Sequence, residues 1–510
     1  GGAGGGAGGG AQGEGQGLPG LSSNFSQAFE ALATRNATMV VTAFNSLGWR
    51  RNQTVAVGPV AGQLALDPVC IRVSDSNGQT LVSQLVFDPL RDTTTLYFHT
   101  GQPVAPLALR SAFVTTTCSV PAKPVPALST TSKLSNGLVS LLFDAQGAVA
   151  QFVDQNGQKF TFAQEYIRYA DRLPNSSNIF SGSNVYSFTP SDSAPVKFDK
   201  LVAGAAGPLV WEASLSSEFI LHTWRLFAGD TKVHVQTKIG VLPDDYSSSI
   251  SLRTRTDLKS GDIFATSTNS FSRMQRKFDT TKPFSGNLYP TSASVSISDG
   301  SSAVSALVRR AVAATASNGT LEVLLHRRLI DSDTRGNDQA VIDDVLAFKV
   351  GSSQGIEADG LALANPLVVR VASVFSMATW LAGMHASVDI MKQPLQEDVH
   401  LLDLKAFCNA TQSPIGMRLH RITGEKGDAP TVVDLQSIFV SEVQMVQETS
   451  LDYQTQPSGL NRWPWRAAEE QTVHVHDRWA HHPTAPSTSP DSATLQARGD
   501  IVAFQFNFLI

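Results

Sequence analysis

The stretch LVSLLFDAQGAVAQFVDQNG, residues 138–157, decides the fold class. It contains two short runs, LVSLLF and AVAQFV, that carry β-branched and aromatic residues, and each run is followed by a polar turn, DAQG and then DQNG. Short runs of this composition between Gly, Asn and Asp are typical of strands joined by turns. The stretch therefore predicts consecutive antiparallel strands.

The same pattern extends from residue 39 almost to the end of the chain, and no long stretch of helical periodicity interrupts it. Many short antiparallel strands over 510 residues indicate β-sandwiches, in which one sheet packs on another. We therefore predict an all-β protein built of consecutive antiparallel β-sandwiches. Further runs of this kind are TTTLYF (93–98), KVHVQTKIGV (232–241), PLVVRVASVF (366–375) and IVAFQFNFLI (501–510).

The N-terminal part of the chain differs from the rest. Residues 1–20 are rich in glycine, and we expect them to be disordered because they cannot bury enough apolar surface. Residues 23–34, SNFSQAFEALAT, carry apolar side chains at i, i+4 and i+7, which predicts a short amphipathic helix. Ser22 or Ser23 can cap its start. The three apolar residues are Phe25, Phe29 and Leu32.

Proline-rich and polar segments indicate where the sandwiches are separated. Residues 120–137 are interpreted as a linker, residues 391–400 as a second boundary, and residues 481–492 as a long surface loop. The predicted division is a disordered tail at 1–20, a short helix with a small sandwich at 21–125, a large sandwich at 126–395 and a C-terminal sandwich at 396–510.

The charge and apolar content of the chain exclude two classes of partner. The net charge is −5 and no basic stripe indicates nucleic-acid binding. No run of 18 apolar residues is present, so no membrane span is expected.

Cysteine and histidine residues do not form a convincing metal site. The three cysteines have no metal-ligand spacing, although Cys70 and Cys118 could form a disulfide. A cluster of four histidines lacks a further ligand at a convincing spacing, and it is interpreted as a solvated group rather than a zinc site. The third cysteine is Cys408, and the histidines are His474, His476, His481 and His482.

Six glycosylation acceptor sequons together favour the secretory route and surface glycans. No signal peptide or initiator Met is present at the start of the sequence, which is therefore interpreted as a fragment or an incomplete gene product. The acceptor residues are Asn24, Asn36, Asn52, Asn175, Asn318 and Asn409.

Charge is concentrated in HRRLIDSDTRGNDQAVIDD, residues 326–344, which follows the expected strand LEVLLH. Arg327 and Arg328 are adjacent, so on a strand they would face opposite sides. Two readings of the stretch are open. It is either a loop that points hydrogen-bond donors at sugar hydroxyls or a surface charge network that holds a loop in place.

The segment LEVLLHRRLIDSDTRG, residues 321–336, resembles a pattern of the class II α-mannosidases, glycoside hydrolase family 38, in particular the lysosomal and vacuolar type. SGSNVYSFTPS (181–191) and GNLYPTSASVSISDG (286–300) resemble further family segments in the same order. The resemblance extends over roughly residues 30–510. It implies that the central sandwich is a large galactose-mutarotase-like supersandwich.

The resemblance also implies a division of labour in the enzyme. In the family, the Asp nucleophile, the acid/base and the zinc ligands lie in an N-terminal α/β domain that precedes the matched region. We therefore expect no catalytic and no metal-binding residue in this chain, and zinc only in the intact enzyme. The expected partners are that N-terminal catalytic domain and mannose-containing glycans, in a lysosomal, vacuolar or other secretory-pathway lumen.

Two residues of this chain match family positions that touch the sugar. Tyr186 aligns with the Tyr of the family's S-G-A-Y pattern if Ser183 and Asn184 are an insertion. Arg335 aligns with the Arg of the family's R-G loop. Both are predicted to bind and position substrate, Tyr186 through its phenol hydroxyl and Arg335 through its guanidinium or the nearby backbone. Two alternatives are open. One is a stand-alone carbohydrate-binding or scaffold module, and the other is a degenerate copy, which departures such as FATSTNS at 264–270 allow.

Overall fold

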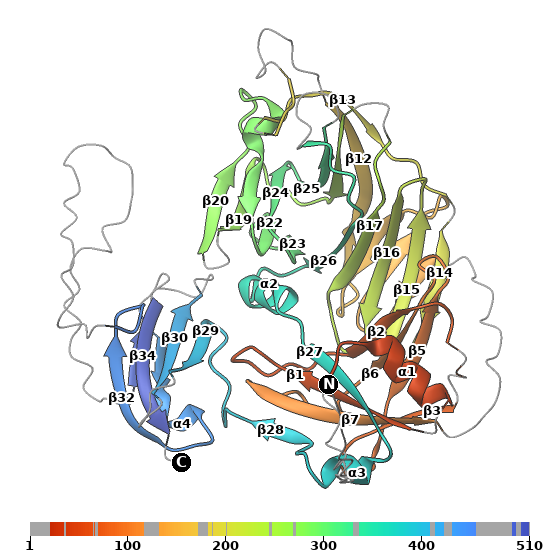
Figure 1. Ribbon diagram of the computed structural model, residues 1–510. Coiled ribbons are helices and arrows are strands. Elements are labelled where there is room, and N and C mark those ends of the chain that lie inside the picture. Colours follow the sequence, from red (N-terminus) through yellow and green to blue (C-terminus); the bar gives the residue numbers. More distant parts are fainter. Residues whose placement is uncertain are drawn as a thin grey trace, which may run out of the picture.

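The computed structural model of the protein describes the parts of the chain that are given at the end of this paragraph. Within them, every strand pairing between named strands is antiparallel, and the sheets group into a small sandwich, a large sandwich and a C-terminal sheet (Figure 1). The predicted all-β class is therefore confirmed. The described residues are 21–34, 37–64, 66, 70–116, 132–171, 182–185, 187–199, 201–243, 247–268, 272–329, 336–407, 414–422, 431–454, 492–495 and 501–508.

The predicted N-terminal helix is present as α1 (Phe25–Thr34). Its Phe29 and Leu32 side chains are buried in the core of the small sandwich, as their spacing predicts. The cap differs from the prediction, because the Gln27 backbone N–H donates to Asn24 Oδ1 at 3.1 Å. Asn is as good a cap as Ser, and it stands one position closer to the helix.

The small sandwich contains a strand from much later in the chain. One sheet has the order β27-β1-β7-β3-β4, with β28 paired to β7, and the other has the order β2-β6-β5. β27 pairs with β1 from Thr38↔Val374 to Phe44↔Val368, so the chain returns to this sandwich after building the large one. The strands are β1 (Thr38–Phe44), β2 (Val55–Ala61), β3 (Ile71–Ser74), β4 (Thr80–Leu81), β5 (Ser83–Asp88), β6 (Thr93–Phe98), β7 (Ala108–Thr116), β27 (Val368–Val374) and β28 (Ser387–Asp389).

The large sandwich packs a nine-stranded sheet against a six-stranded sheet. The nine-stranded order is β14-β15-β16-β17-β26-β23-β22-β19-β20, and the six-stranded order is β13-β12-β18-β25-β24-β21. The nine strands are β14 (Val202–Ala206), β15 (Val210–Ser216), β16 (Ile220–Phe227), β17 (Val233–Ile239), β19 (Ile263–Thr268), β20 (Ser272–Lys277), β22 (Ser294–Ser298), β23 (Ala303–Val308) and β26 (Ile342–Val350). The six strands are β12 (Ala163–Asp171), β13 (Pro190–Pro195), β18 (Ser248–Arg255), β21 (Tyr289–Thr291), β24 (Val312–Ser317) and β25 (Thr320–Arg328).

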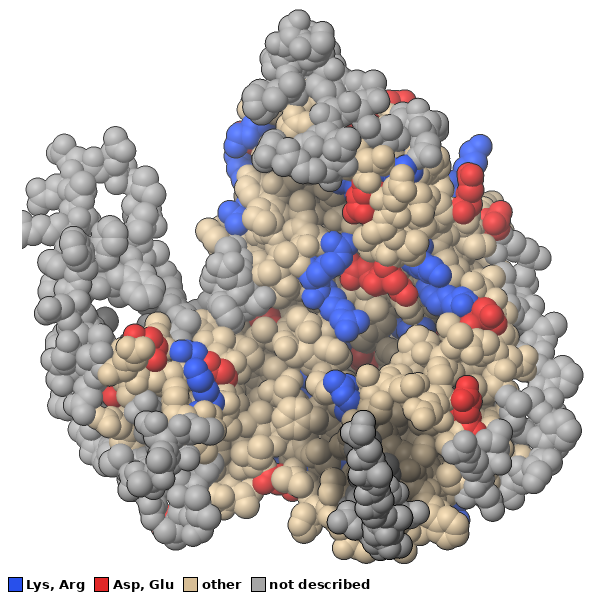
Figure 2. All heavy atoms as spheres, in the orientation of Figure 1, with Lys and Arg blue, Asp and Glu red and all other residues tan. Residues whose placement is uncertain are grey.

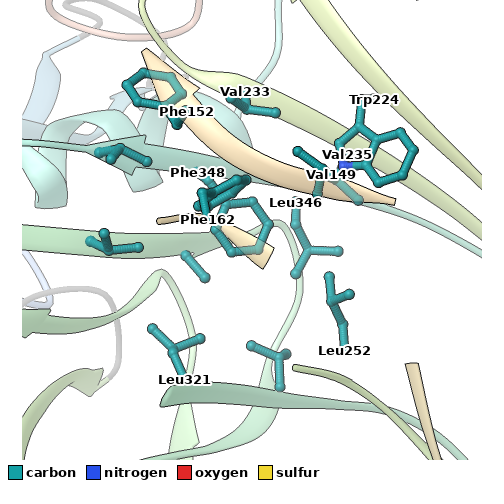
Figure 3. Packing of buried hydrophobic residues seen from close by; sticks show 14 of the residues in the cluster. Val149, Phe152, Phe162, Trp224, Val233, Val235, Leu252, Leu321, Leu346 and Phe348 are labelled. Carbon is teal, nitrogen blue, oxygen red and sulfur yellow. The ribbon is translucent and has the colours of Figure 1, made fainter. Parts of the chain in front are cut away.

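A smaller sheet with the order β11-β10-β9-β8 joins the same core. Two of its strands come from the stretch LVSLLFDAQGAVAQFVDQNG, residues 138–157. Figure 3 shows the core from close by, where Phe162 and Phe348 meet edge to face with their ring centroids 5.4 Å apart. The strands are β8 (Lys133–Ser135), β9 (Ser140–Phe143), β10 (Val149–Val153) and β11 (Lys159–Thr161).

The C-terminal sheet has the order β29-β30-β34-β32, and β31 pairs separately with β33. Its core includes Leu47 and Trp49 from the segment after β1, so the C-terminal sheet is packed against the small sandwich. The division at 125 and 395 stays a prediction, although the pairing of β27 with β1 crosses the first boundary, at residue 125. The strands are β29 (Val399–Ala406), β30 (Ile415–Arg421), β31 (Thr431–Asp434), β32 (Val443–Thr449), β33 (Ser492–Leu495) and β34 (Ile501–Phe508).

Short helices fill the remaining connections. None of the helices in the described ranges is both long enough and apolar enough to cross a membrane. These helices are α2 (Ile356–Ala364), α3 (Met377–Leu381), α4 (Leu435–Ile438) and the 3-10 turn η3 (Phe284–Asn287).

Basic and acidic side chains lie together on the visible face of the molecule. Figure 2 shows them side by side near the centre of the view, where β16, β17 and β26 lie in Figure 1. Cross-strand pairs of opposite charge on these strands and β15 include Glu212 with Arg225 and Lys238 with Asp343. Because the charges alternate in sign, this face has no basic stripe of the kind that binds nucleic acid.

Candidate functional site

Tyr186 and Arg335, the two predicted substrate-binding residues, lie outside the described residues. Their chain neighbours Val185 and Gly336 are described, and these two residues adjoin. A Cβ atom added to Gly336 would lie 3.4 Å from Val185 Cγ1 and 2.9 Å from Leu329 Cβ. Only glycine fits this approach without a shift of its neighbours. The described chain neighbours of the two predicted residues therefore lie in contact with each other.

The loop that contains Gly336 is closed at its base by the backbone. The Leu329 N–H donates to the Gly336 carbonyl oxygen at 2.8 Å, directly after the end of β25. The six-stranded sheet thus ends at Arg328, and Gly336 lies next to Leu329 before the chain enters β26 of the nine-stranded sheet. This places the loop at the end of a strand, where sandwich proteins carry their binding surfaces.

Arg327 ties the neighbouring loop to the sheet. Its Nη2 donates to the carbonyl oxygens of Ser187 at 3.0 Å and Asn184 at 3.5 Å, which lie on either side of position 186. Its Nε donates to Ser249 Oγ at 3.3 Å, and its guanidinium lies 5.0 Å from the centre of the Phe188 ring. A planar guanidinium can make these contacts together, which a lysine could not.

Asp171 is buried beneath the same loop and accepts two hydrogen bonds. Ser183 Oγ and Ser249 Oγ each donate to its carboxylate at 2.9 Å. Burial raises the pKa of Asp171, while the two serine hydrogen bonds and the nearby Arg327 act in the opposite direction. Asp171, Ser183, Ser249 and Arg327 therefore form one polar cluster that holds Ser183, Asn184 and Ser187 in place.

Arg328 faces the other side of β25, as predicted for adjacent strand residues. Its Nε donates to Asn337 Oδ1 at 2.8 Å, and its Nη1 donates to the Leu242 carbonyl oxygen. Arg328 is only 2% exposed. It therefore connects the start of the segment after Gly336 to the segment that precedes β18.

The remaining described charges of residues 326–344 also have structural partners. His326 Nδ1 lies 4.0 Å from Asp338 Oδ2, and burial lowers the pKa of His326 against the attraction of Asp338. Arg310 Nε pairs with Asp344 Oδ2 at 2.7 Å. The described part of the stretch therefore acts as a charge network that holds the loops in place, and direct contact with sugar stays a prediction for Arg335.

Other predicted sites are only partly visible in the described chain. Of the six acceptor asparagines, Asn24, Asn52 and Asn318 are exposed, and the other three lie outside the described residues. Cys70 is disulfide-bonded, and its predicted partner Cys118 is outside the described part. The histidine cluster at 474–482 also lies outside it. In the described chain, no group of three or more His, Cys, Asp or Glu is placed to hold a metal.

A second polar network on the six-stranded sheet was not anticipated from the sequence. Glu322 accepts a hydrogen bond from Tyr169 at 2.6 Å and another from Arg253 at 2.9 Å. The only local signal was an acidic residue in the apolar run LEVLLH. Its partners stand 153 and 69 residues earlier in the chain, so sequence spacing gives no indication of the pairing.

A comparison with protein families matches residues 134–335 to the family described as the glycosyl hydrolases family 38 C-terminal domain. An α-mannosidase of Arabidopsis thaliana is 26% identical over 402 residues, which cover 71% of this chain and 38% of that protein. The lysosomal α-mannosidase of Homo sapiens is 22% identical over 487 residues, which cover 87% of this chain and 47% of that protein. The chain thus spans less than half the length of these two relatives.

Solved structures with the same fold come from Enterococcus faecalis. The crystal structure of an α-mannosidase from strain V583 matches with a TM-score of 0.61 at 12% identity, over 94% of this chain and 58% of that one. A second crystal structure, of a glycosyl hydrolase family 38 protein, matches with a TM-score of 0.60 at 11% identity, over 94% of this chain and 59% of that one. At this identity the match concerns the fold alone.

Proposed function

Because residues 134–335 belong to the glycosyl hydrolase family 38 C-terminal domain, we propose that the chain is the carbohydrate-contacting β region of a retaining α-mannosidase. The substrate of the intact enzyme would be α-linked mannose of N-glycans. The contact between Val185 and Gly336 is the observation that carries the proposal. Val185 and Gly336 are the chain neighbours of Tyr186 and Arg335, and these two resemble sugar-contacting positions of the family.

In this proposal the two residues position the substrate rather than perform the chemistry. The Tyr186 hydroxyl and the Arg335 guanidinium would hydrogen-bond sugar hydroxyls, which fixes the scissile bond against catalytic groups supplied elsewhere. Arg327 and Asp171 support this role, because their hydrogen bonds hold the chain on both sides of position 186.

The catalytic groups are proposed to belong to the N-terminal domain of the intact enzyme. Zinc is implied by the family, but the described residues offer no group of three metal ligands, so we derive no step through zinc in this chain. In the intact enzyme, zinc held by the N-terminal domain would contact mannose hydroxyls. The N-terminal domain is accordingly the proposed partner.

The proposed location is the lumen of a lysosome, a vacuole or another secretory compartment. The relatives include a lysosomal α-mannosidase, and three acceptor asparagines of this chain are exposed. Attached glycans at Asn24, Asn52 or Asn318, detected by mass spectrometry of protein from a glycosylating host, would agree with this location.

The first experiment tests whether residues 1–510 hydrolyse mannosides by themselves. Incubation with an aryl α-mannoside and zinc should give no turnover above that of a Tyr186→Phe, Arg335→Lys double variant. Turnover above that background would contradict the proposed dependence on an N-terminal catalytic domain.

The second experiment uses the intact enzyme and tests the positioning role. Tyr186→Phe and Arg335→Lys should each lower kcat/KM by roughly 10- to 100-fold, because each removes or misplaces a hydrogen bond to the sugar. Tyr289→Phe and Arg72→Lys serve as matched controls. Unchanged kcat/KM in both test variants would refute the assignment of these two residues.

The alternative function is a stand-alone carbohydrate-binding module. Loops at the ends of strands favour this function, because such loops can bind a sugar without a second domain opposite them. The two functions differ in how binding of methyl α-D-mannopyranoside responds to a family catalytic domain added in trans. If the chain is the β region of an enzyme, it should bind the mannoside more tightly when that domain is present. If it is a stand-alone module, it should bind the mannoside equally well without the domain.

A further inference from the structure

A groove on the outer face of the six-stranded sheet is not part of the loops described above. It lies over β18, β24 and β25 and is bordered by the segment that leads into η3. Its volume is about 210 Å³, which suits one sugar ring rather than an extended chain. We call it the Phe284 groove. It is lined by Arg253, Arg255, Phe278, Phe284, Thr315 and Glu322, together with small residues between them.

The polar side of the Phe284 groove is a row of side chains that crosses four strands. Glu165 on β12 stands opposite Arg253 on β18, Arg253 opposite Glu322 on β25, and Glu322 opposite Thr315 on β24. Arg253 Nε donates to Glu322 Oε2 at 2.9 Å, and its Nη1 lies 3.7 Å from Glu165 Oε1. Arg255 donates to the same Glu165 oxygen. Each guanidinium therefore already faces a carboxylate.

The Thr315 hydroxyl at the end of this row has no hydrogen-bond partner. Thr315 is 3% exposed, and its Oγ1 neither donates nor accepts in the described chain. A buried hydroxyl without a partner is costly, and such groups are uncommon in folded proteins. Thr315 is among the residues that line the groove, so a small shift of the atoms that cover its Oγ1 would let a ligand hydroxyl provide the missing bond.

The apolar side of the groove consists of two phenylalanines. Phe278 and Phe284 are both partly exposed. Phe284 is stacked on Tyr169 with ring centroids 5.2 Å apart, so its ring is held in a fixed orientation. Phe284 also packs against Phe188 at 6.1 Å, which connects the groove to the loop of residues 182–188.

We propose that the Phe284 groove binds a single neutral hexose unit of a glycan. The phenylalanine rings offer an apolar surface to the C–H face of a pyranose, while the carboxylates, guanidiniums and the Thr315 hydroxyl match its ring hydroxyls. The two arginines are balanced by two glutamates, so the site carries no net charge that would favour a phosphate or carboxylate group. None of the groove residues is Tyr186 or Arg335, so the inference does not depend on the proposed function.

Calorimetric titration of the whole chain tests the groove. The probes are methyl α-D-mannopyranoside, methyl α-D-glucopyranoside and the methyl glycoside of N-acetylglucosamine, with mannose 6-phosphate as the anionic probe. Protein from a bacterial host is used, because Thr320 lines the groove and belongs to the sequon of Asn318. We expect at least one neutral glycoside to bind and the phosphate to add no affinity.

Two variants assign that binding to the groove. Thr315→Val removes a buried hydroxyl that has no internal partner, so it should not lower the unfolding midpoint, and it should weaken glycoside binding about fivefold. Arg255→Gln changes a side chain that is 53% exposed and should weaken binding to a similar extent. The matched controls are Thr54→Val, which also removes an unpartnered hydroxyl, and Arg72→Gln, and both should bind as the wild type does.

Three results would overturn the inference. The first is that none of the neutral glycosides binds. The second is binding that neither Thr315→Val nor Arg255→Gln weakens. The third is that mannose 6-phosphate binds more tightly than the neutral sugars. Tyr186→Phe and Arg335→Lys separate the two proposals. Binding that depends on those two residues but not on Thr315 would support the proposed function and reject the groove.

Discussion

At the scale of single residues, Asp171 makes the candidate site sensitive to pH. Its side chain is 5% exposed, and burial raises its pKa above the ordinary value of 3.8. In the unfolded chain this carboxyl loses its proton near 3.8, but in the folded chain it keeps the proton to a higher pH. Its contribution to stability is therefore fully present below the unfolded pKa and is lost as the pH rises through the folded pKa.

We predict that Asp171→Asn removes this pH dependence. The asparagine can still accept from one of the two serine hydroxyls, but it cannot ionise. The wild type should lose stability relative to the variant as the pH rises above 3.8, by about 1.4 kcal/mol for each pH unit that separates the two pKa values. Urea unfolding of both proteins from about pH 3.5 to about pH 7.5 measures the difference. A difference that stays constant over this range would contradict the prediction.

For single residues, the sequence predicted on which side of a strand a side chain lies but not which residues it contacts. Strand alternation correctly placed Arg327 and Arg328 on opposite sides of β25. The partners could not be predicted, since Ser187 and Leu242 stand 140 and 86 residues away in the chain. The local pattern also offered two serines as helix caps, whereas the backbone entered the helix one residue later and used Asn24.

At the scale of elements, β26 is the central strand that links the two halves of the nine-stranded sheet. It pairs with β17 on one side and β23 on the other, and its Phe348 side chain is completely buried. Phe348 points into the core and meets Phe162 there (Figure 3). A strand with neighbours on both sides cannot move to close a gap, so a cavity at this position should persist.

Phe348→Ala should therefore lower the free energy of unfolding by about 3–5 kcal/mol, which is the usual range for a large aromatic core residue. Phe375→Ala is the matched control. Phe375 is 87% exposed, and its loss should change stability by no more than about 0.5 kcal/mol. Chemical unfolding followed by tryptophan fluorescence measures both variants. Equal stability of the two variants would show that Phe348 does not contribute to the core as proposed.

The existence of the strands could be read from the sequence far better than their order. Apolar alternation and turn residues mark each strand locally, as in LVSLLFDAQGAVAQFVDQNG, which forms β9 and β10. The order within a sheet depends on which apolar faces meet after folding, and local patterns do not encode this. The row from Glu165 to Thr315 illustrates the difference, because it appears only when β12, β18, β25 and β24 lie side by side.

At the scale of the whole molecule, the small sandwich depends on residues that follow the large one. β27 covers one edge of β1, and the Ser22 backbone bonds to Val371 of β27 in both directions, at 2.7 and 2.8 Å. β1 is buried along almost its entire length. Without β27, one side of this buried strand would expose unpaired N–H and C=O groups and apolar side chains.

We predict that residues 21–116 expressed alone do not form a stable monomer. An exposed apolar edge strand is a template for association, so the fragment should aggregate or show a poorly dispersed amide NMR spectrum. Joining residues 366–390 to its C-terminus through a flexible glycine–serine linker should restore a monomer with dispersed signals, because β27 and β28 then return to β1 and β7. As a control, the same linker can carry a 366–390 segment with Val371→Asp and Val369→Asp, which cannot pack against β1. A monomeric and well-dispersed spectrum for residues 21–116 alone would mean that the first sandwich is independent of the later strand, as the boundary at residue 125 implies.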